Sequence, residues 1–180
     1  LVYARVQTWQ VQQSDEAITP PYDRRPQVGV RALGPAFGGL EYSFETEVNR
    51  FALNDSAINV DRPTATRWHA LGSVSRPWRE PGWWVVPRLS VNAAAYDLDQ
   101  PLPDGQRRVS RSVPTASVDA GWTLERDTTA FGRQLRQTLE PRLYYLYSER
   151  EDQTDQPIFD SAELTFNYYQ LFRETRFAGY

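Results

Sequence analysis

The stretch Thr138-Leu139-Glu140-Pro141-Arg142-Leu143-Tyr144-Tyr145-Leu146-Tyr147 decides the fold, because its residues alternate in character with a period of two. One set is apolar or aromatic, and the interleaved set carries Glu140 and Arg142. This is the pattern of a β-strand with two different faces. Residues 114–124 repeat the pattern, and residues 127–133 connect the two runs. The sequence therefore predicts a hairpin here, and several hairpins in series along the chain.

Composition limits the class of protein. The chain has 180 residues, of which 40% are hydrophobic, so one domain is the simplest expectation. Aromatic residues make up 13%, with six Trp and ten Tyr, which favours strands and membrane-interface belts over a helical bundle. A net charge of -3 with scattered Arg argues against nucleic-acid binding. The absence of Cys excludes disulfides, thiolate chemistry and Cys-based metal sites within this stretch.

Strand-like runs follow one another along the chain, separated by connections that alternate in length. After a loosely alternating start over residues 1–13, strands are expected over residues 26–33, 40–48, 65–75, 83–95, 114–124 and 139–147. Long connections are expected at residues 14–25, 54–64 and 97–108 and from 149 onward, and short ones at 34–39, 76–82 and 127–133. The predicted fold class is therefore all-β: an antiparallel up-and-down meander of about seven strands, forming a segment of a large transmembrane β-barrel.

The two faces of these strands differ in charge. The apolar face carries no ionisable residue in the six strands from residue 26 onward. An Arg facing lipid near the bilayer midplane costs about 2–4 kcal/mol, so the charged face is expected to line a watery lumen. The residues predicted to face the lumen are Glu41, Glu45, Glu47, Arg67, His69, Arg88, Asp119, Glu125, Glu140 and Arg142.

Aromatic residues on the apolar face gather near the ends of the strands. In membrane barrels, such residues form girdles at both interfaces. The residues predicted to lie there are Trp68, Trp83, Trp122, Tyr145 and Tyr147. Three prolines, at positions 87, 114 and 141, fall within strand-like runs. Because Pro cannot donate to the ladder, each is expected to mark a bulge or a gap in pairing.

A different class of protein also fits part of the pattern. Glu41, Glu45 and Glu47 share one strand face and could supply a carboxylate pair for glycoside hydrolysis in a soluble β-sandwich, or the sandwich could bind carbohydrate. His69 is the only His, so triads and His-based metal sites have one candidate and no visible partner. The favoured expectation is a non-enzymatic barrel segment with no cofactor and no metal.

Several short motifs follow one another in order along the chain: Pro21-Tyr22-Asp23-Arg24-Arg25-Pro26-Gln27, Ala65-Thr66-Arg67, Ser112-Val113-Pro114, Leu124-Glu125-Arg126-Asp127, Gln137 to Tyr147, Phe159-Asp160-Ser161, Gln170-Leu171-Phe172-Arg173 and Arg176-Phe177-Ala178-Gly179. Together these motifs resemble one known family, LptD, also called Imp or OstA. The ordered series spans most of the chain. The resemblance implies that residues 1–180 are an interior part of a barrel of about 26 strands in the outer membrane of a Gram-negative bacterium.

The resemblance also implies a function and partners. The family assembles lipopolysaccharide into the outer leaflet through a lateral gate, with an LptE-like lipoprotein plugging the lumen. An LptA-like periplasmic bridge delivers the lipid to a jelly-roll domain that precedes the barrel. The gate strands and the jelly-roll domain are expected to lie outside this stretch, which begins without Met and looks like a piece of a longer protein.

The last predicted segment, residues 149–180, is expected to lie outside the membrane, because residues 149–155 concentrate charge. Its aromatic residues are expected to pack inward over the barrel mouth: Phe159, Phe166, Tyr168, Tyr169 and Phe172.

Overall fold

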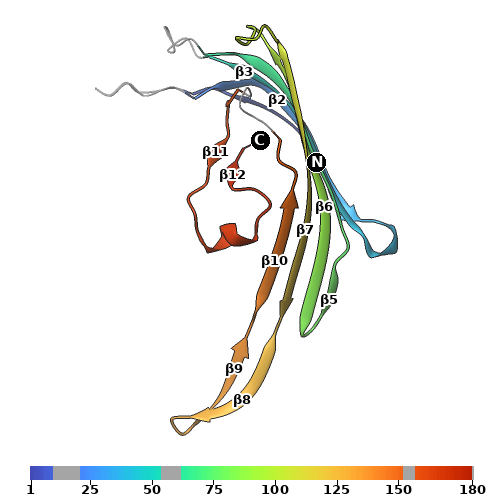
Figure 1. Ribbon diagram of the computed structural model, residues 1–180, viewed down its shortest axis with the longest axis vertical. Coiled ribbons are helices and arrows are strands. Elements are labelled where there is room, and N and C mark those ends of the chain that lie inside the picture. Colours follow the sequence, from blue (N-terminus) through green and yellow to red (C-terminus); the bar gives the residue numbers. More distant parts are fainter. Residues whose placement is uncertain (10–20, 54–61, 152–156, 180) are drawn as a thin grey trace, which may run out of the picture.

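The computed structural model describes residues 1–9, 21–53, 62–151 and 157–179, and it is dominated by one long, curved antiparallel sheet (Figure 1). The strands of this eight-stranded sheet are β1 (Val2–Gln7), β2 (Asp23–Pro35), β3 (Glu41–Ala52), β4 (Ala65–Ser75), β5 (Trp78–Glu80), β6 (Trp83–Leu98), β7 (Arg108–Trp122) and β10 (Arg142–Ser148). Neighbours follow the order β1-β2-β3-β4-β6-β7-β10, and β5 pairs with β6. The predicted all-β meander is confirmed.

The remaining elements are small or lie beyond the sheet. A second hairpin, β8 (Leu124–Ala130) with β9 (Arg133–Leu139), continues from the ends of β7 and β10. Near the C-terminus, β11 (Ala162–Glu163) pairs with β12 (Phe177–Ala178), and two short 3-10 turns are η1 (Phe37–Gly39) and η3 (Tyr168–Phe172). In the part of the chain that the structure describes, no helix is long and apolar enough to cross a membrane.

The hairpin predicted from residues 114–124 and 139–147 is confirmed, and the structure gives its register. Arg142 pairs with Gly121 and Ser148 with Thr115 in the main sheet, and Leu124 pairs with Leu139 in the continuing hairpin. β6 and β7 have 16 and 15 residues, well above the usual length of about 5–6. Strands of this length suit a tilted crossing of a bilayer.

Two short connections are shorter than the sequence predicted. Residues 76–82 contain β5, so only Pro81 and Gly82 remain as the turn to β6. Residues 127–133 are mostly strand, and the turn is reduced to Phe131 and Gly132. The long connection at 97–108 is confirmed, since β6 ends at Leu98 and β7 begins at Arg108. The long connections at 14–25 and 54–64 lie largely outside the described residues, as does part of the charged run at 149–155.

Pro87 and Pro114 cause no bulge in the β6–β7 register, where they lie opposite Val118 and Val91. On the other side of its strand each marks a gap in pairing, which is the second outcome that the sequence predicted. Pro87 lies between the β6 residues that pair with β4, which end at Arg88, and those that pair with β5, which begin at Val85. Pro114 lies just past Thr115, the last β7 residue that pairs with β10. Each carbonyl still accepts a hydrogen bond, from the amides of Arg76 and Glu149, but Pro has no N–H to donate in return. Pro141 also lies in a gap, between β9 and β10.

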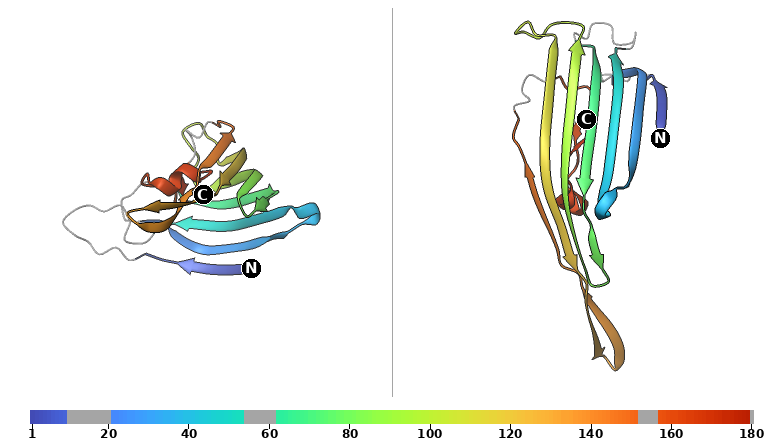
Figure 2. Two further views of the ribbon diagram at one scale, coloured as in Figure 1. Left: turned by 90° about the horizontal axis from the view of Figure 1, so that it is seen from below. Right: turned by 90° about the vertical axis from the view of Figure 1, so that its right-hand side faces the viewer.

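Residues 157–179, which we call the strap, fold back against the concave side of the sheet (Figures 1 and 2). The sequence had suggested that this segment packs over one end of the sheet only. Instead, the strap lies along the concave side. The small core lies where the strap meets the sheet near the long-loop end: Tyr22, Phe51, Ala65, Ala94, Tyr96, Leu98 and Phe159. Of the strap aromatics predicted to pack inward, Phe159 is buried and Phe172 contacts Tyr144, whereas Phe166, Tyr168 and Tyr169 are exposed.

Candidate functional site on the concave face

Strand alternation places every second residue on the concave face, and the register aligns these residues from strand to strand. The face is polar because many of these residues are polar or charged. Glu47 lies at the centre of a buried network and is 3% exposed. It accepts from the hydroxyl of Tyr3 at 2.6 Å and from the side-chain amides of Gln27 and Asn49. A carboxylate removed from water is tolerated here because three donors replace its hydration.

The strap contributes a carboxylate to this face next to the network. Asp160 accepts from both terminal nitrogens of Arg67, at 2.6 and 2.9 Å, and from Nη2 of Arg24 at 2.9 Å. The side chains of Arg67 and Asp160 are 1% and 8% exposed, and Arg24 is 26% exposed. The paired geometry is that of a charge-assisted, two-pronged contact. It holds the strap to β2 and β4 at once.

Aromatic rings pack beside this contact. Phe159 stacks on Phe51 with ring centroids 4.6 Å apart and meets Tyr22 at 5.0 Å and Tyr96 at 5.9 Å. The guanidinium of Arg67 lies over the Phe51 ring, 4.7 Å from its centre. Aromatic stacking and the cation–π contact both fix the orientation of the Arg67 side chain.

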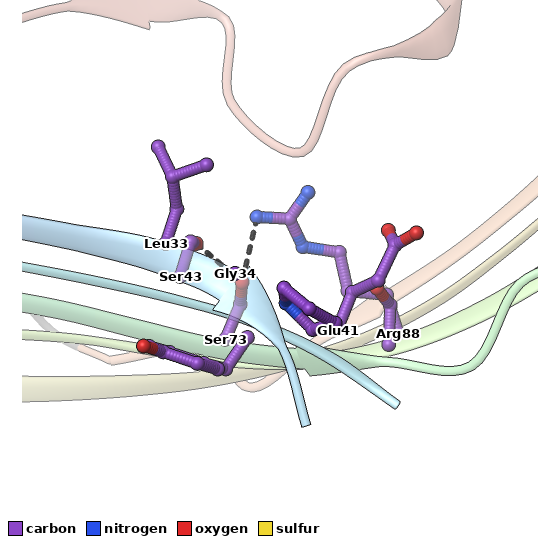
Figure 3. Close-up of a pocket in the computed structure, with 9 residues that line it drawn as sticks. Leu33, Gly34, Glu41, Ser43, Ser73 and Arg88 are labelled. Atoms are coloured by element: carbon purple, nitrogen blue, oxygen red, sulfur yellow. Dashed lines mark hydrogen bonds between the residues drawn. The ribbon is translucent and has the colours of Figure 1, made fainter. Parts of the chain in front are cut away.

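A second strap carboxylate, Glu174, contacts the wall nearer the short-turn end. It accepts from the hydroxyls of Ser90 at 2.9 Å and Ser117 at 3.1 Å, and lies 3.4 Å from Nε of Arg88. Arg88 also lines an open pocket, where it donates to Ser73 at 2.9 Å, and Ser73 shares a 2.7 Å hydrogen bond with Ser43 (Figure 3).

The third contact zone joins β7, β10 and the strap. Arg142 forms a two-pronged ion pair with Asp119, at 2.9 and 2.8 Å. The ring of Phe172 covers the Arg142 guanidinium at 4.2 Å. The strap is therefore attached at three places along the concave face.

The predicted lumen-facing residues divide into two groups. Eight share the concave face: Glu41, Glu45, Glu47, Arg67, His69, Arg88, Asp119 and Arg142. Among them, Glu45 pairs with Arg31 at 2.7 Å, Glu41 with Arg79 at 3.4 Å, and His69 Nε2 lies 3.1 Å from Asn92 Oδ1. Glu125 and Glu140 lie beyond the main sheet. Glu125 is on β8, 3.6 Å from Arg136, and Glu140 is exposed between β9 and β10.

The sequence did not predict a site role for four residues that take part in these contacts: Tyr3 and Arg24 of the concave face, and Asp160 and Glu174 of the strap. Asp160 and Arg67 are 93 positions apart, and no local pattern links them. The motif Phe159-Asp160-Ser161 did appear in the family resemblance, and that was the only signal that pointed to it.

The convex face carries large apolar side chains that are exposed. Leu89 is 67% exposed, and the predicted interface residues Trp68, Trp83, Trp122, Tyr145 and Tyr147 all lie on this face at 40–62%. Trp83 and Trp122 are direct partners where β6 and β7 approach the short-turn end. The register places charges on this face at the ends of strands, at Arg50, Asp97 and Arg108 near the long loops and at Glu80 beside a short turn.

Asp99, the first residue of the long loop between β6 and β7, is held to the sheet by hydrogen bonds. It accepts from both terminal nitrogens of Arg50, at 2.9 and 2.6 Å, and from the hydroxyl of Thr64. The hydrogen bonds from Arg50 hold the pKa of the Asp99 carboxyl below its ordinary value. Within the described ranges, no group of three or more His, Cys, Asp or Glu side chains is arranged to hold a metal ion.

The sheet is curved and antiparallel, and its strands are long. Its convex face exposes apolar side chains, and its concave face carries paired charges. These features define the class of protein: the chain is a segment of a β-barrel wall. It belongs to the LptD family, since the family model described as "LptD: LPS transport system D" matches residues 2–180. The family expectation drawn from the sequence motifs is confirmed.

Individual relatives agree with this assignment. Proteins named LPS-assembly protein LptD are 39% identical over 176 residues in Albidiferax ferrireducens, 40% over 178 in Acidovorax sp. (strain JS42) and 37% over 188 in Ralstonia nicotianae. Each match covers 97–98% of this chain and 21–22% of the relative. The chain therefore spans about a fifth of the length of these curated relatives.

Proposed function

We propose that this chain is a non-enzymatic wall segment of a lipopolysaccharide-assembly translocon in the outer membrane of a Gram-negative bacterium. The observation that carries the proposal is the opposition of the two faces. Leu89 and its convex neighbours suit contact with lipid tails, and the paired charges of the concave face suit a watery lumen. Membership of the LptD family supplies the cargo, lipopolysaccharide.

The partners follow from the same proposal. An LptE-like lipoprotein occupies the lumen that the concave face borders, and an LptA-like bridge delivers lipopolysaccharide through an N-terminal periplasmic domain. Residues 1–180 form an interior part of the wall of the barrel domain. The lateral gate is formed by other strands of that barrel. The aromatic residues of the convex face, among them Trp83 and Trp122, lie at the membrane interfaces.

The rival, a soluble glycosidase or carbohydrate-binding sandwich, is not favoured. A glycosidase needs two carboxylates placed on either side of one bond. Here Glu47 is buried among three donors, Glu45 pairs with Arg31, and Glu41 pairs with Arg79. Each carboxylate has its own structural partner, and the proposal includes no catalytic residue.

The test compares two leucines on opposite faces of neighbouring strands. In the complete barrel protein, Leu89→Arg places a charge on the convex face and Leu71→Arg places one on the concave face, beside Glu45. The convex charge is expected to cost about 2–4 kcal/mol if Leu89 lies near the bilayer midplane. Leu89→Arg should therefore lower the amount of folded barrel and of lipopolysaccharide at the cell surface in a depletion strain. Leu71→Arg should leave both near wild type, and equal losses for the two variants would contradict the proposed orientation.

A further inference from the structure

Both strap carboxylates that touch the wall end in cradles of hydrogen-bond donors. Asp160 lies between Arg67 and Arg24, and Glu174 lies between two serine hydroxyls and Arg88. The strap thus bonds to the wall as an anionic ligand would.

The donors around Asp160 suit more than a carboxylate. Guanidinium groups bind phosphate with the same two-pronged geometry. Arg67 is fixed in place, being 1% exposed and stacked over Phe51, so its donors are already oriented. Arg24 is 26% exposed, so this side of the cradle is open to solvent. A phosphate approaching from the lumen would meet Arg24 first.

The wall surface next to Arg24 and Arg67 is aromatic. Phe51, Tyr22 and Tyr96 surround the ring of Phe159, which is the strap residue just before Asp160. If Phe159 and Asp160 leave together, the space exposed is a flat apolar surface beside two guanidinium groups. This combination fits a phosphorylated sugar, whose ring presents an apolar face and whose phosphate is the anion.

The strap can leave the wall without breaking a ladder of the main sheet, because its strands β11 and β12 pair with each other and not with the wall. Its own regular structure is two paired residues on each side, β11 and β12, and the turn η3. Phe166, Tyr168 and Tyr169 are 75%, 66% and 78% exposed, so the stretch between the contacts at Asp160 and Phe172 is largely in solvent. Attachment depends on a few separate contacts, each of which can be replaced by an equivalent group.

From these observations we infer that Arg24 and Arg67 form a binding site for a sugar phosphate, and that Asp160 is its resident ligand, displaced when a phosphorylated glycolipid reaches the lumen. This inference rests on the proposed function and identifies the group of the cargo that the wall binds. No covalent step is involved: one anion replaces another on the same donors, and the strap moves away from the wall.

The direct test measures binding of glucose 1-phosphate to the complete barrel protein, with its lipoprotein partner, in detergent. A tethered ligand competes at an effective concentration on the order of millimolar, so Asp160→Asn should tighten binding at least about tenfold over wild type. Adding Arg24→Gln to Asp160→Asn should remove the gain. Glu163→Gln is the matched control, because Glu163 is a strap carboxylate that pairs with Arg176 within the strap and not with the wall. Equal affinities of wild type and Asp160→Asn, or an undiminished gain in the double variant, would overturn the inference.

A second measurement uses the wild-type protein and does not depend on how well a variant folds. Amide hydrogen exchange of residues 157–179 is compared with and without lipopolysaccharide, using intact, enzymatically dephosphorylated and core-truncated forms. Phosphorylated forms should speed exchange across the strap, and the dephosphorylated form should not. The truncated form separates lipid-anchor phosphates from core phosphates as the source. Strap exchange that ignores phosphorylation refutes the site, whereas a failure of the wall function would appear in the Leu89 and Leu71 comparison instead.

Discussion

At the scale of single residues, the concave face gathers charged side chains and orders them in pairs. Arg67 is almost fully buried, yet Asp160 and, at 3.8 Å, Glu47 lie against it. Burial of an unpaired charge would cost several kcal/mol, so such a residue requires partners. One of the partners comes from the strap, and therefore the strap and the wall depend on each other.

Phe159 tests this dependence, because it is the strap residue packed most deeply among wall side chains. Phe159→Ala removes contacts with Phe51, Tyr22 and Tyr96 and should weaken strap attachment by about 3 kcal/mol, as for other buried aromatics. That corresponds to roughly a hundredfold faster amide exchange in the strap if exchange follows local opening.

The matched control for this substitution is Phe166→Ala, since Phe166 is on the same strap and is 75% exposed. Its exchange should match wild type. If both variants open the strap equally, the aromatic cluster is not what attaches it.

At the scale of elements, the sequence predicted the strands well and the turns poorly. Strands such as residues 40–48 were recognisable because a two-sided sheet imposes a period of two on the side chains. β8 and β9 were not recognised in full, because Leu124–Ala130 and Arg133–Leu139 carry polar residues on both faces, and leucines on one face alternate with Arg126 and Gln137. Their pairing depends instead on cross-strand contacts such as Arg126 to Gln137 at 2.7 Å and Arg136 to Asp127 at 3.2 Å.

The candidate site was predictable to the same degree and for the same reason. His69 and Glu47 could be placed on the polar face because alternation alone determines the face. Asp160 and Glu174 could not be placed, because their neighbours come from strands far away in the sequence. The register of distant segments depends on packing that no short pattern records.

The turn between β8 and β9 gives a prediction at this scale. Phe131 and Gly132 have φ values of 53° and 71°, and positive values at both central positions are what a type I′ hairpin turn requires. Phe131 is fully exposed and pays a steric penalty that Asn largely avoids. Phe131→Asn should therefore stabilise the hairpin by about 0.5–1 kcal/mol, seen as slower amide exchange in β8 and β9.

The companion variant Gly132→Val should act in the opposite direction, because a β-branched residue is strained at this φ. Faster exchange in Phe131→Asn, or none of the expected loss in Gly132→Val, would show that the turn does not control the hairpin.

At the scale of the whole molecule, the described sheet is an open wall. β1 pairs only with β2, and β10 only with β7, within the residues that the structure describes. In a bilayer, every backbone donor and acceptor must be paired, so β1 and β10 require further strands beside them. Short and long connections lie at opposite ends of the sheet. The turns at Pro81–Gly82 and Phe131–Gly132 lie at one end, and the loop at residues 99–107 lies at the other (Figure 1).

Outer-membrane barrels place short turns in the periplasm and long loops outside the cell, so we expect the short-turn end of this sheet to face the periplasm. The chain has no Cys, so a single introduced thiol in this stretch is labelled without background from it. Asp104, in the long loop, and Thr129, beside the β8–β9 turn, are both exposed. In the complete barrel protein on whole cells, Asp104→Cys should react with a membrane-impermeant thiol reagent. Thr129→Cys should react only after the outer membrane is permeabilised, because its end of the sheet faces the periplasm. The opposite labelling pattern would invert the wall.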